Sequence, residues 1–289
     1  MLNDYMLNDC MLNDKNGLIL GVANEFSLAA FIANAAHANG ASLAFNYLPD
    51  ASSGGAKAEK RVRRVTDPLN SQFVMPCDLT SDQSTDAFFT ALQRQWSRLD
   101  FLVHSVAWAP LEDILCQTID ASRAGFREAM DISVYSFLAS ARRAAELMPD
   151  GGSIMTLSYY GGEKVVAGYN LMGLCKAALE SAVRYAANEL GPRGIRVNAI
   201  SAGPVKTLSA SAVGATGTSG GIDDMLHLHR LVAPLRRNIT GGDVGNIACW
   251  LASDLAASIT GEVIHADCGY NIMGGAPESL QRLHEPGRK

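Results

Sequence analysis

Short apolar runs alternate with longer helical windows from residue 17 almost to the C-terminus of this 289-residue chain. Runs of this kind, apolar on both faces, are typical of strands in a parallel sheet that helices cover on both sides. The predicted strands are 17-GLILGV-22, 41-ASLAFNY-47, 72-QFVMPCDL-79, 100-DFLVHSVAW-108, 153-SIMTLSY-159, 195-IRVNAIS-201 and 262-EVIHAD-267.

The windows between the strands carry start and stop signals of helices. The window 28–39 ends at Gly40, a favourable C-terminal cap, and the window 82–96 follows Ser81, a favourable N-cap. The longest window, 121–148, stops at the turn signal 149-PDGG-152. Strands that alternate with helices, and no Pro/Gly/Ser-rich linker, predict a single doubly wound, Rossmann-type α/β domain with a seven-stranded parallel sheet.

Three parts of the chain depart from this alternation. Residues 1–14 contain MLND three times at a period of five, which fits neither helix nor strand, so we expect a disordered leader before a domain over 15–275. A duplicated coding stretch or an uncertain start site also explains the repeat. Residues 209–221 are almost all small, which favours a flexible lid near 208–232 over a plain surface loop. Residues 276–289 form a C-terminal tail.

Composition narrows the function. Apolar residues make up 48% and charged residues 18%, enough apolar sequence for a substantial core, and the net charge of −5 disfavours a nucleic-acid partner. Six cysteines without a CxxC pair argue against a zinc site or disulfide framework and favour the reducing cytoplasm. The run 17–23 is too short to span a bilayer, so we expect no membrane segment.

Several weak signals lie at the carboxyl ends of successive strands, where open α/β sheets bind ligands. Gly21 allows a diphosphate to approach the backbone, and the helix that begins near Ser27 offers free N–H groups. Asp78 is able to bond an adenine amino group or to belong to the start of the next helix, and the sequence leaves both open. The stretches 105-SVAWA-109 and 201-SAGPVKT-207 follow two further strands.

A tyrosine and a lysine stand seven positions apart in 169-YNLMGLCK-176, within a predicted helix. In hydride-transferring α/β enzymes the spacing is normally four. A spacing of seven leaves the side chains about 20° apart around the helix and about 10.5 Å apart along it. Both therefore share one face, but the tyrosine is mounted almost a turn farther back. Its donor thus approaches a substrate from a different place.

The run 153–210, with a second tyrosine at Tyr159 ten residues before Tyr169, closely resembles bacterial NADH-dependent enoyl-acyl-carrier-protein reductase, a divergent short-chain dehydrogenase/reductase. The resemblance extends through GVANEFSLA, CDL, HSVAWAP, DISVYSF, APLRR and SDLAASITGEVIHADCGYNI, and so covers residues 17–273.

The resemblance implies reduction of a trans-2-enoyl thioester, bound to acyl carrier protein, by a homotetramer that uses NADH. It implies that Tyr169 is the hydrogen-bond donor to the thioester oxygen, that Lys176 holds the nicotinamide ribose, and that Tyr159 assists or shapes the pocket. Ala109, Ile222 and Met225 are expected to contact the acyl chain. The expected cofactor contacts are Gly21, Ser27, Leu28, Asp78, Leu79, Ser105, Val106, Ala107, Lys176, Gly203, Pro204, Val205 and Thr207.

The chain departs from the family pattern in ways that keep alternatives open. Leu48 stands where the family often has glutamine, no acidic residue lies in 45–49, and 57-KAEKRVRR-64 is basic, so NADPH stays an alternative to NADH. Ala107 replaces a common glycine and Trp108 is bulkier than the usual aromatic residue. A carbonyl reductase of the same superfamily is disfavoured because position 173 is glycine, not lysine. A non-catalytic dinucleotide-binding paralogue is the other alternative.

Overall fold

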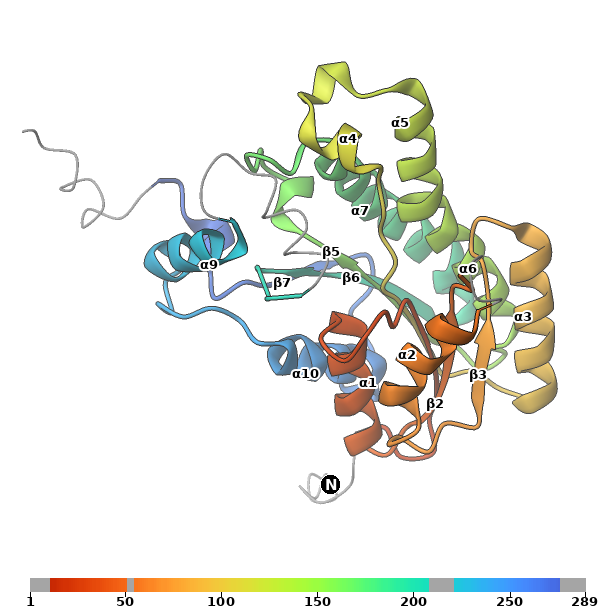
Figure 1. Ribbon diagram of the computed structural model, residues 1–289. Coiled ribbons are helices and arrows are strands. Elements are labelled where there is room, and N and C mark those ends of the chain that lie inside the picture. The colour runs from red at the N-terminus through yellow and green to blue at the C-terminus, as the bar shows by residue number, and fades with distance from the viewer. Residues whose placement is uncertain (1–10, 51–54, 208–220, 276–289) are drawn as a thin grey trace, which may run out of the picture.

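Seven parallel strands form one sheet in the order β3-β2-β1-β4-β5-β6-β7 (Figure 1). The computed structural model describes residues 11–50, 55–207 and 221–275. Each predicted strand is present and the predicted fold class is confirmed. The strands are β1 Asn16–Leu20, β2 Ser42–Tyr47, β3 Phe73–Pro76, β4 Phe101–His104, β5 Gly152–Ser158, β6 Ile195–Ala202 and β7 Val263–Ala266.

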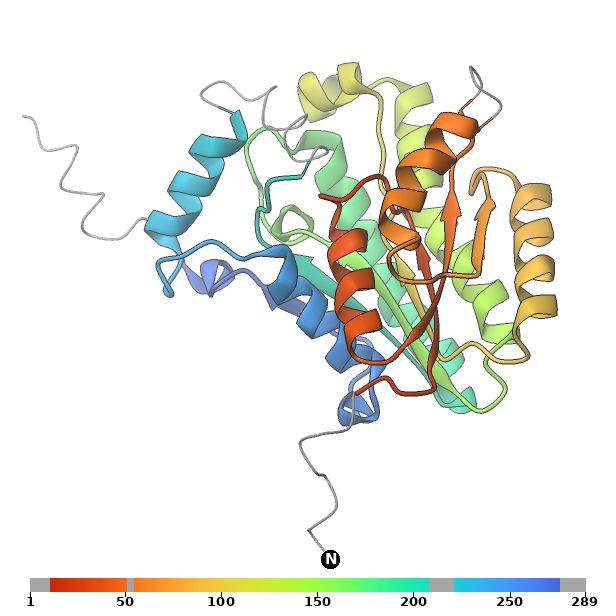
Figure 2. The same cartoon turned by 60° about the horizontal axis from the view of Figure 1, so that its bottom comes forward.

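Helices cover both faces of the sheet (Figure 2). Successive residues of β1 serve two cores: Leu18 and Leu20 pack into one, and Ile19 packs into the other, as the period of two in a strand requires. The first core lies under α3 Asp82–Gln95, α6 Ser136–Glu146 and α7 Asn170–Leu190. The second lies under α1 Leu28–Ala38, α2 Ala56–Thr66 and α10 Gly241–Ala252.

The predicted helix signals act as expected. The Ser27 side chain accepts a hydrogen bond from the Ala30 backbone N–H at the start of α1, and the Ser81 side chain accepts one from Ser84 at the start of α3. Gly40, just beyond α1, has a φ of +92°, which a glycine adopts without strain.

The long helix expected over 121–148 is interrupted. α5 Arg123–Met130 and α6 are joined by a five-residue π-helical turn, η2 Asp131–Tyr135. Turns of this kind insert one residue into a helix and occur often at functional sites. Short helices complete the described chain: α4 Leu111–Leu115, η1 Thr118–Asp120, η3 Tyr160–Gly162, η4 Gly191–Arg193, η5 Asp254–Ala256 and η6 Tyr270–Ile272.

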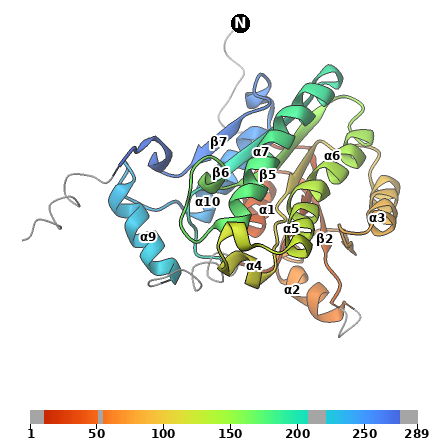
Figure 3. The ribbon, with the colours of Figure 1, turned by 90° about the horizontal axis from the view of Figure 1, so that it is seen from above.

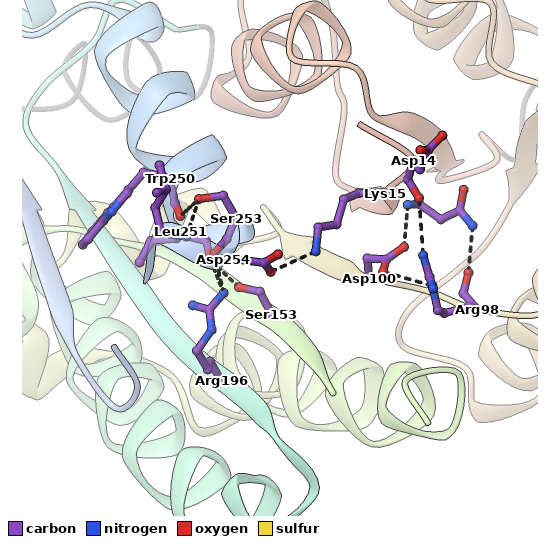
Figure 4. Close-up of polar contacts among 12 residues, drawn as sticks. Asp14, Lys15, Arg98, Asp100, Ser153, Arg196, Trp250, Leu251, Ser253 and Asp254 are labelled. Atoms are coloured by element: carbon purple, nitrogen blue, oxygen red, sulfur yellow. Dashed lines mark hydrogen bonds and ion pairs between the residues drawn. The ribbon is translucent and has the colours of Figure 1, made fainter. Parts of the chain in front are cut away.

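The third MLND copy is part of the domain, so the expectation of a disordered leader is wrong for residues 11–14. Leu12 is fully buried in the core under α1, and its backbone N–H donates to Asn39 O at 2.9 Å. Arg98 donates to Asp14 O at 3.4 Å, and Lys15 pairs with Asp254 at 2.9 Å (Figure 4). The five-residue period of the repeat gave no sign of this burial. The packing of the apolar Leu12 side chain holds residues 11–14 on the domain. Residues 1–10 lie outside the described residues.

The predicted lid is described only in part. Residues 208–220 and the tail 276–289 lie outside the described residues. The lid region continues as α9 Gly221–Val232, which lies at the side of the molecule where β6 and β7 run (Figure 3). Among the helices of the described residues, none is long and apolar enough to cross a membrane.

Candidate active site

The predicted site residues gather along one edge of the sheet. Gly21 follows β1, Ser105 follows β4, Tyr159 follows β5 and Gly203 follows β6. Because all the strands are parallel, their carboxyl ends meet at this edge, where α/β sheets hold their ligands.

Gly21 occupies a position that no other residue fits. Its φ is +93°, and a Cβ built on it would lie 2.2 Å from Ser105 O. Its N–H donates to Asn46 Oδ1 at 3.0 Å, and Asn46 Nδ2 donates to Cys77 O at 3.3 Å. The buried Asn46 amide therefore joins the ends of three strands beside the glycine turn. Asn46 was not predicted as a site residue, although a single amide inside the apolar run 41–47 was the available signal.

Asp78 takes part in a local turn. Its Oδ1 accepts from the Thr80 N–H at 2.9 Å and from the Thr80 hydroxyl at 2.7 Å, just before α3. This matches the helix-start alternative from the sequence, and an adenine contact stays a prediction.

The π-helical turn η2 holds the loop 105–109. The Ser133 hydroxyl accepts from Trp108 N–H and donates to Trp108 O, both at 3.0 Å. At the other end of the loop, His104 Nε2 lies 2.8 Å from Ser136 Oγ, which donates to Ile132 O. Burial, with help from the Lys176 charge, lowers the pKa of His104 to about 3, so the ring is neutral. These serines were not predicted, because a π-turn leaves no hydrophobic period to recognise.

Lys176 is a buried ammonium with donors to spare. Its Nζ donates to Leu157 O at 2.8 Å, its only acceptor among the described residues, and 6% of the residue is exposed. Burial lowers the pKa of Lys176 to about 8. An ammonium has three N–H donors, so two are left for a ligand. A ribose with two hydroxyl acceptors fits this residue.

Tyr159 and Tyr169 form an edge-to-face pair with ring centroids 4.8 Å apart. Burial raises the pKa of Tyr159 to about 12 and raises that of Tyr169 as well, so both phenols stay protonated. The sequence predicted that Tyr169 lies inside the helix, and this is wrong. It is the N-cap residue of α7, which begins at Asn170.

Close packing explains why position 173 is glycine. A Cβ at Gly173 would lie 2.9 Å from Gly161 O, and a Cβ at Gly161 would lie 2.4 Å from the Tyr169 ring. The 3-10 turn η3 therefore lies directly against α7. A lysine four residues after Tyr169 would have to displace this turn.

A cavity of about 540 Å³ opens beside the two tyrosines. Of the predicted substrate residues, Tyr159, Tyr169 and Met225 line it, while Ala109 and Ile222 are buried without lining it. α4 contributes Ile114 and Leu115, and the predicted cofactor residues Gly203 and Pro204 also face it. The lining is completed by Tyr160, Val165, Val166, Ala167, Gly168, Asn170, Ser201, Ala202, Gly221, Asp224, Leu228, His229, Asp267 and Tyr270.

A Rossmann-type sheet with a tyrosine and a buried lysine at its carboxyl edge defines the class of short-chain dehydrogenases/reductases. Residues 21–271 match the family model described as Enoyl-(Acyl carrier protein) reductase. The chain belongs to this enoyl-acyl-carrier-protein reductase family.

Relatives agree over nearly the whole chain. The enoyl-[acyl-carrier-protein] reductase [NADH] of Nostoc sp. is 48% identical over 90% of this chain and 97% of its own. The structure of the Anaplasma phagocytophilum reductase with NAD has a TM-score of 0.86 at 44% identity, covering 94% of this chain and 99% of that one. The Bacillus cereus reductase with NADP+ and indole naphthyridinone has a TM-score of 0.85 at 43% identity, covering 92% and 99%.

Proposed function

We propose that this chain reduces trans-2-enoyl thioesters of acyl carrier protein to saturated acyl thioesters with NADH, in fatty-acid elongation. The observation that carries the proposal is the Tyr159–Tyr169 pair on the wall of the cavity. The buried Lys176 lies in α7, the helix for which Tyr169 is the N-cap residue. The full-length similarity to NADH-dependent enoyl reductases supports the same reaction.

The chemistry needs a donor at the thioester oxygen. A bound nicotinamide would supply a hydride to the β-carbon of the enoyl chain, and negative charge would collect on the thioester oxygen. An O–H held toward that oxygen stabilises the charge, as donors in oxyanion sites do. Tyr169 is suited to this role because it lines the cavity, and burial raises its pKa further above neutral pH, so its hydroxyl is a protonated donor. Tyr159 packs on the Tyr169 ring and limits its directions.

Lys176 holds the ribose in this proposal, and Gly21 together with residues 105–107 contacts the dinucleotide. NADH is proposed over NADPH on the similarity to NADH-dependent relatives, and the basic run in α2 is a weaker argument for NADPH because part of its charge is already paired. Arg63 bonds Glu59 at 2.7 Å, and Arg64 lies 3.7 Å from Glu25. Leu48, 63% exposed, offers no hydrogen bond to the adenosine.

A homotetramer in the cytoplasm is part of the proposal. Large apolar side chains are exposed along α5, η2, α6 and α7, a helical face suited to a second copy of the chain: Phe126, Tyr135, Leu138, Leu174 and Tyr185. The described cysteines, Cys77, Cys116, Cys175, Cys249 and Cys268, are free thiols, which fits a reducing compartment.

The test is a pair of assays that follow NADH absorbance. We expect oxidation of NADH with crotonyl thioester and none with acetoacetyl thioester. Oxidation with acetoacetyl thioester alone would establish the carbonyl-reductase alternative. NADH binding without turnover of either thioester would establish the non-catalytic alternative.

A further inference from the structure

Asn170, directly after the proposed donor Tyr169, has a φ of +36°. This left-handed region is strained for residues with a side chain, although asparagine tolerates it better than most. Strain of this kind persists only where surrounding contacts hold it, and it concentrates at functional sites. The contacts of Asn170 therefore need an explanation.

The Asn170 amide holds the end of α4. Its Nδ2 donates to Ile114 O and to Cys116 O, both at 2.8 Å. Carbonyl groups in the last turn of a helix lack partners within the helix, and these two lie at the C-terminal end of α4. Both amide N–H groups are therefore used to cap α4. In Figure 3, α4 lies beside the N-terminal end of α7.

α4 forms a wall of the substrate cavity, and its Ile114 side chain also packs into the core under α3, α6 and α7. Ile114 and Leu115 line the same cavity as Tyr169 and Asn170. The buried Asp113 carboxylate of α4 makes a second hydrogen-bonded contact. It accepts from the Ser122 N–H at 2.5 Å and from the Ser122 hydroxyl at 3.1 Å, and Ser122 is the N-cap residue of α5. α4 is thus fixed to α5 at one point and to the residue beside Tyr169 at another.

We propose that Asn170 is a positioning residue that sets the direction of the Tyr169 phenol and the place of the α4 wall together. Its left-handed backbone ends the chain turn that carries Tyr169, and its amide keeps that turn in contact with α4. The proposal rests on the proposed enoyl-reductase function. It predicts that the donor and the acyl-chain wall lose their alignment together when the amide is removed.

Three substitutions separate the amide from the backbone. Asn170→Ala removes the amide and leaves a strained φ, Asn170→Gly removes the amide and relieves the strain, and Asn170→Asp replaces the amide donors with oxygens that face two carbonyls. We expect kcat with crotonyl thioester to fall about 10- to 100-fold in the Ala and Gly variants, because a displacement of about 1 Å has that effect, and further in the Asp variant. The NADH dissociation constant, measured by fluorescence, should stay within about twofold because the ribose lysine is untouched.

Acyl-chain length gives a readout that general destabilisation does not move. The loss in kcat/KM should be larger for a dodecenoyl than for a crotonyl thioester, because the longer chain reaches the α4 wall. Asn70→Ala is the matched control, since the exposed Asn70 also has a left-handed φ, +53°, and lies outside the cavity. It should lose thermal stability without changing kcat.

A wild-type kcat in Asn170→Gly would overturn the inference, because the amide would then be dispensable. Any loss in Asn170→Ala would in that case come from backbone strain alone. Equal losses for both chain lengths would overturn the link to α4. A wild-type enzyme that turns over no enoyl thioester refutes the proposed function instead, and the parallel wild-type assay makes that failure visible.

Discussion

If Lys176 holds the ribose, as proposed, its lowered pKa should set an upper pH limit on cofactor binding. Burial lowers this pKa to about 8, so the free protein loses this ammonium as the pH rises through that value. If the charged lysine holds the ribose, the NADH dissociation constant should be flat below about pH 7.5 and rise about tenfold per pH unit above the pKa. Fluorescence titration across this range measures it.

Lys176→Arg provides the control, because a guanidinium stays charged across this range. Its NADH affinity should be independent of pH, whatever its absolute value. The lowered pKa of Lys176 also affects the free energy of unfolding, but there a rise in pH is favourable. Between the lowered pKa and the ordinary lysine value the unfolded chain binds more protons, so the Lys176 contribution makes the free energy of unfolding rise with pH. A wild-type dissociation constant that does not change up to about pH 9.5 would remove Lys176 from the ribose site.

The Tyr169 hydroxyl is the group that the proposed chemistry needs most. Tyr169→Phe keeps the ring packed on Tyr159 and removes only the donor. We expect kcat to fall about 100- to 1000-fold, the usual loss for one oxyanion donor, with NADH affinity nearly unchanged. Tyr159→Phe should lose less. A larger loss of kcat in Tyr159→Phe than in Tyr169→Phe would show that Tyr159, not Tyr169, is the donor to the thioester oxygen.

At the scale of elements, we expect the π-helical turn η2 to hold the loop 105–109 in position for the cofactor. Ser133→Ala removes both hydrogen bonds to the Trp108 backbone. At about 1 kcal/mol each, their loss should raise the NADH dissociation constant about 5- to 30-fold. Ser140→Ala is the matched control, because the buried Ser140 hydroxyl in α6 has no hydrogen-bond partner among the described residues. It should bind NADH like wild type, and an equal change in both variants would disprove the role of Ser133.

The third MLND copy should contribute to stability and not to catalysis. Leu12→Ala empties a fully buried site, which typically lowers the free energy of unfolding by about 2–5 kcal/mol. Met11→Ala, at a residue that is 37% exposed, should have a small effect. Urea unfolding of both variants measures the difference. Equal stability of Leu12→Ala and wild type would show that this segment detaches in solution.

These elements also show how far sequence alone reaches. Strands and the Ser27 and Ser81 caps were predictable, because their apolar runs and cap residues are local signals. The π-turn was not, because it leaves no hydrophobic period to recognise. The Asn46 bridge and the Asn170 cap were not, because each depends on a contact between residues distant in the chain. Tyr169 and Lys176 were found from their spacing together with the family resemblance of the run 153–210. The position of Tyr169 at the helix start was not predicted, because it depends on the turn that precedes the helix.

At the scale of the whole molecule, the exposed apolar face on α5–α7 predicts self-association. Light scattering on the purified protein should give about four times the 30.7 kDa chain mass, since the family resemblance implies a homotetramer and apolar faces of this kind are usually covered in oligomers. Leu138→Glu, at an exposed leucine of α6, should shift the mass toward smaller species. A monomeric wild-type protein at micromolar concentration would contradict the tetramer.

The proposed function requires hydride delivery to the β-carbon of an enoyl thioester inside the cavity beside Tyr169. The most direct measurement uses NADH that carries deuterium at the transferred position, crotonyl thioester and the wild-type protein, with NMR of the product. We expect a butyryl thioester with one deuterium at C3 and a solvent-derived proton at C2. Deuterium at C1 or C2, or no deuterium in the product, would contradict the proposed function.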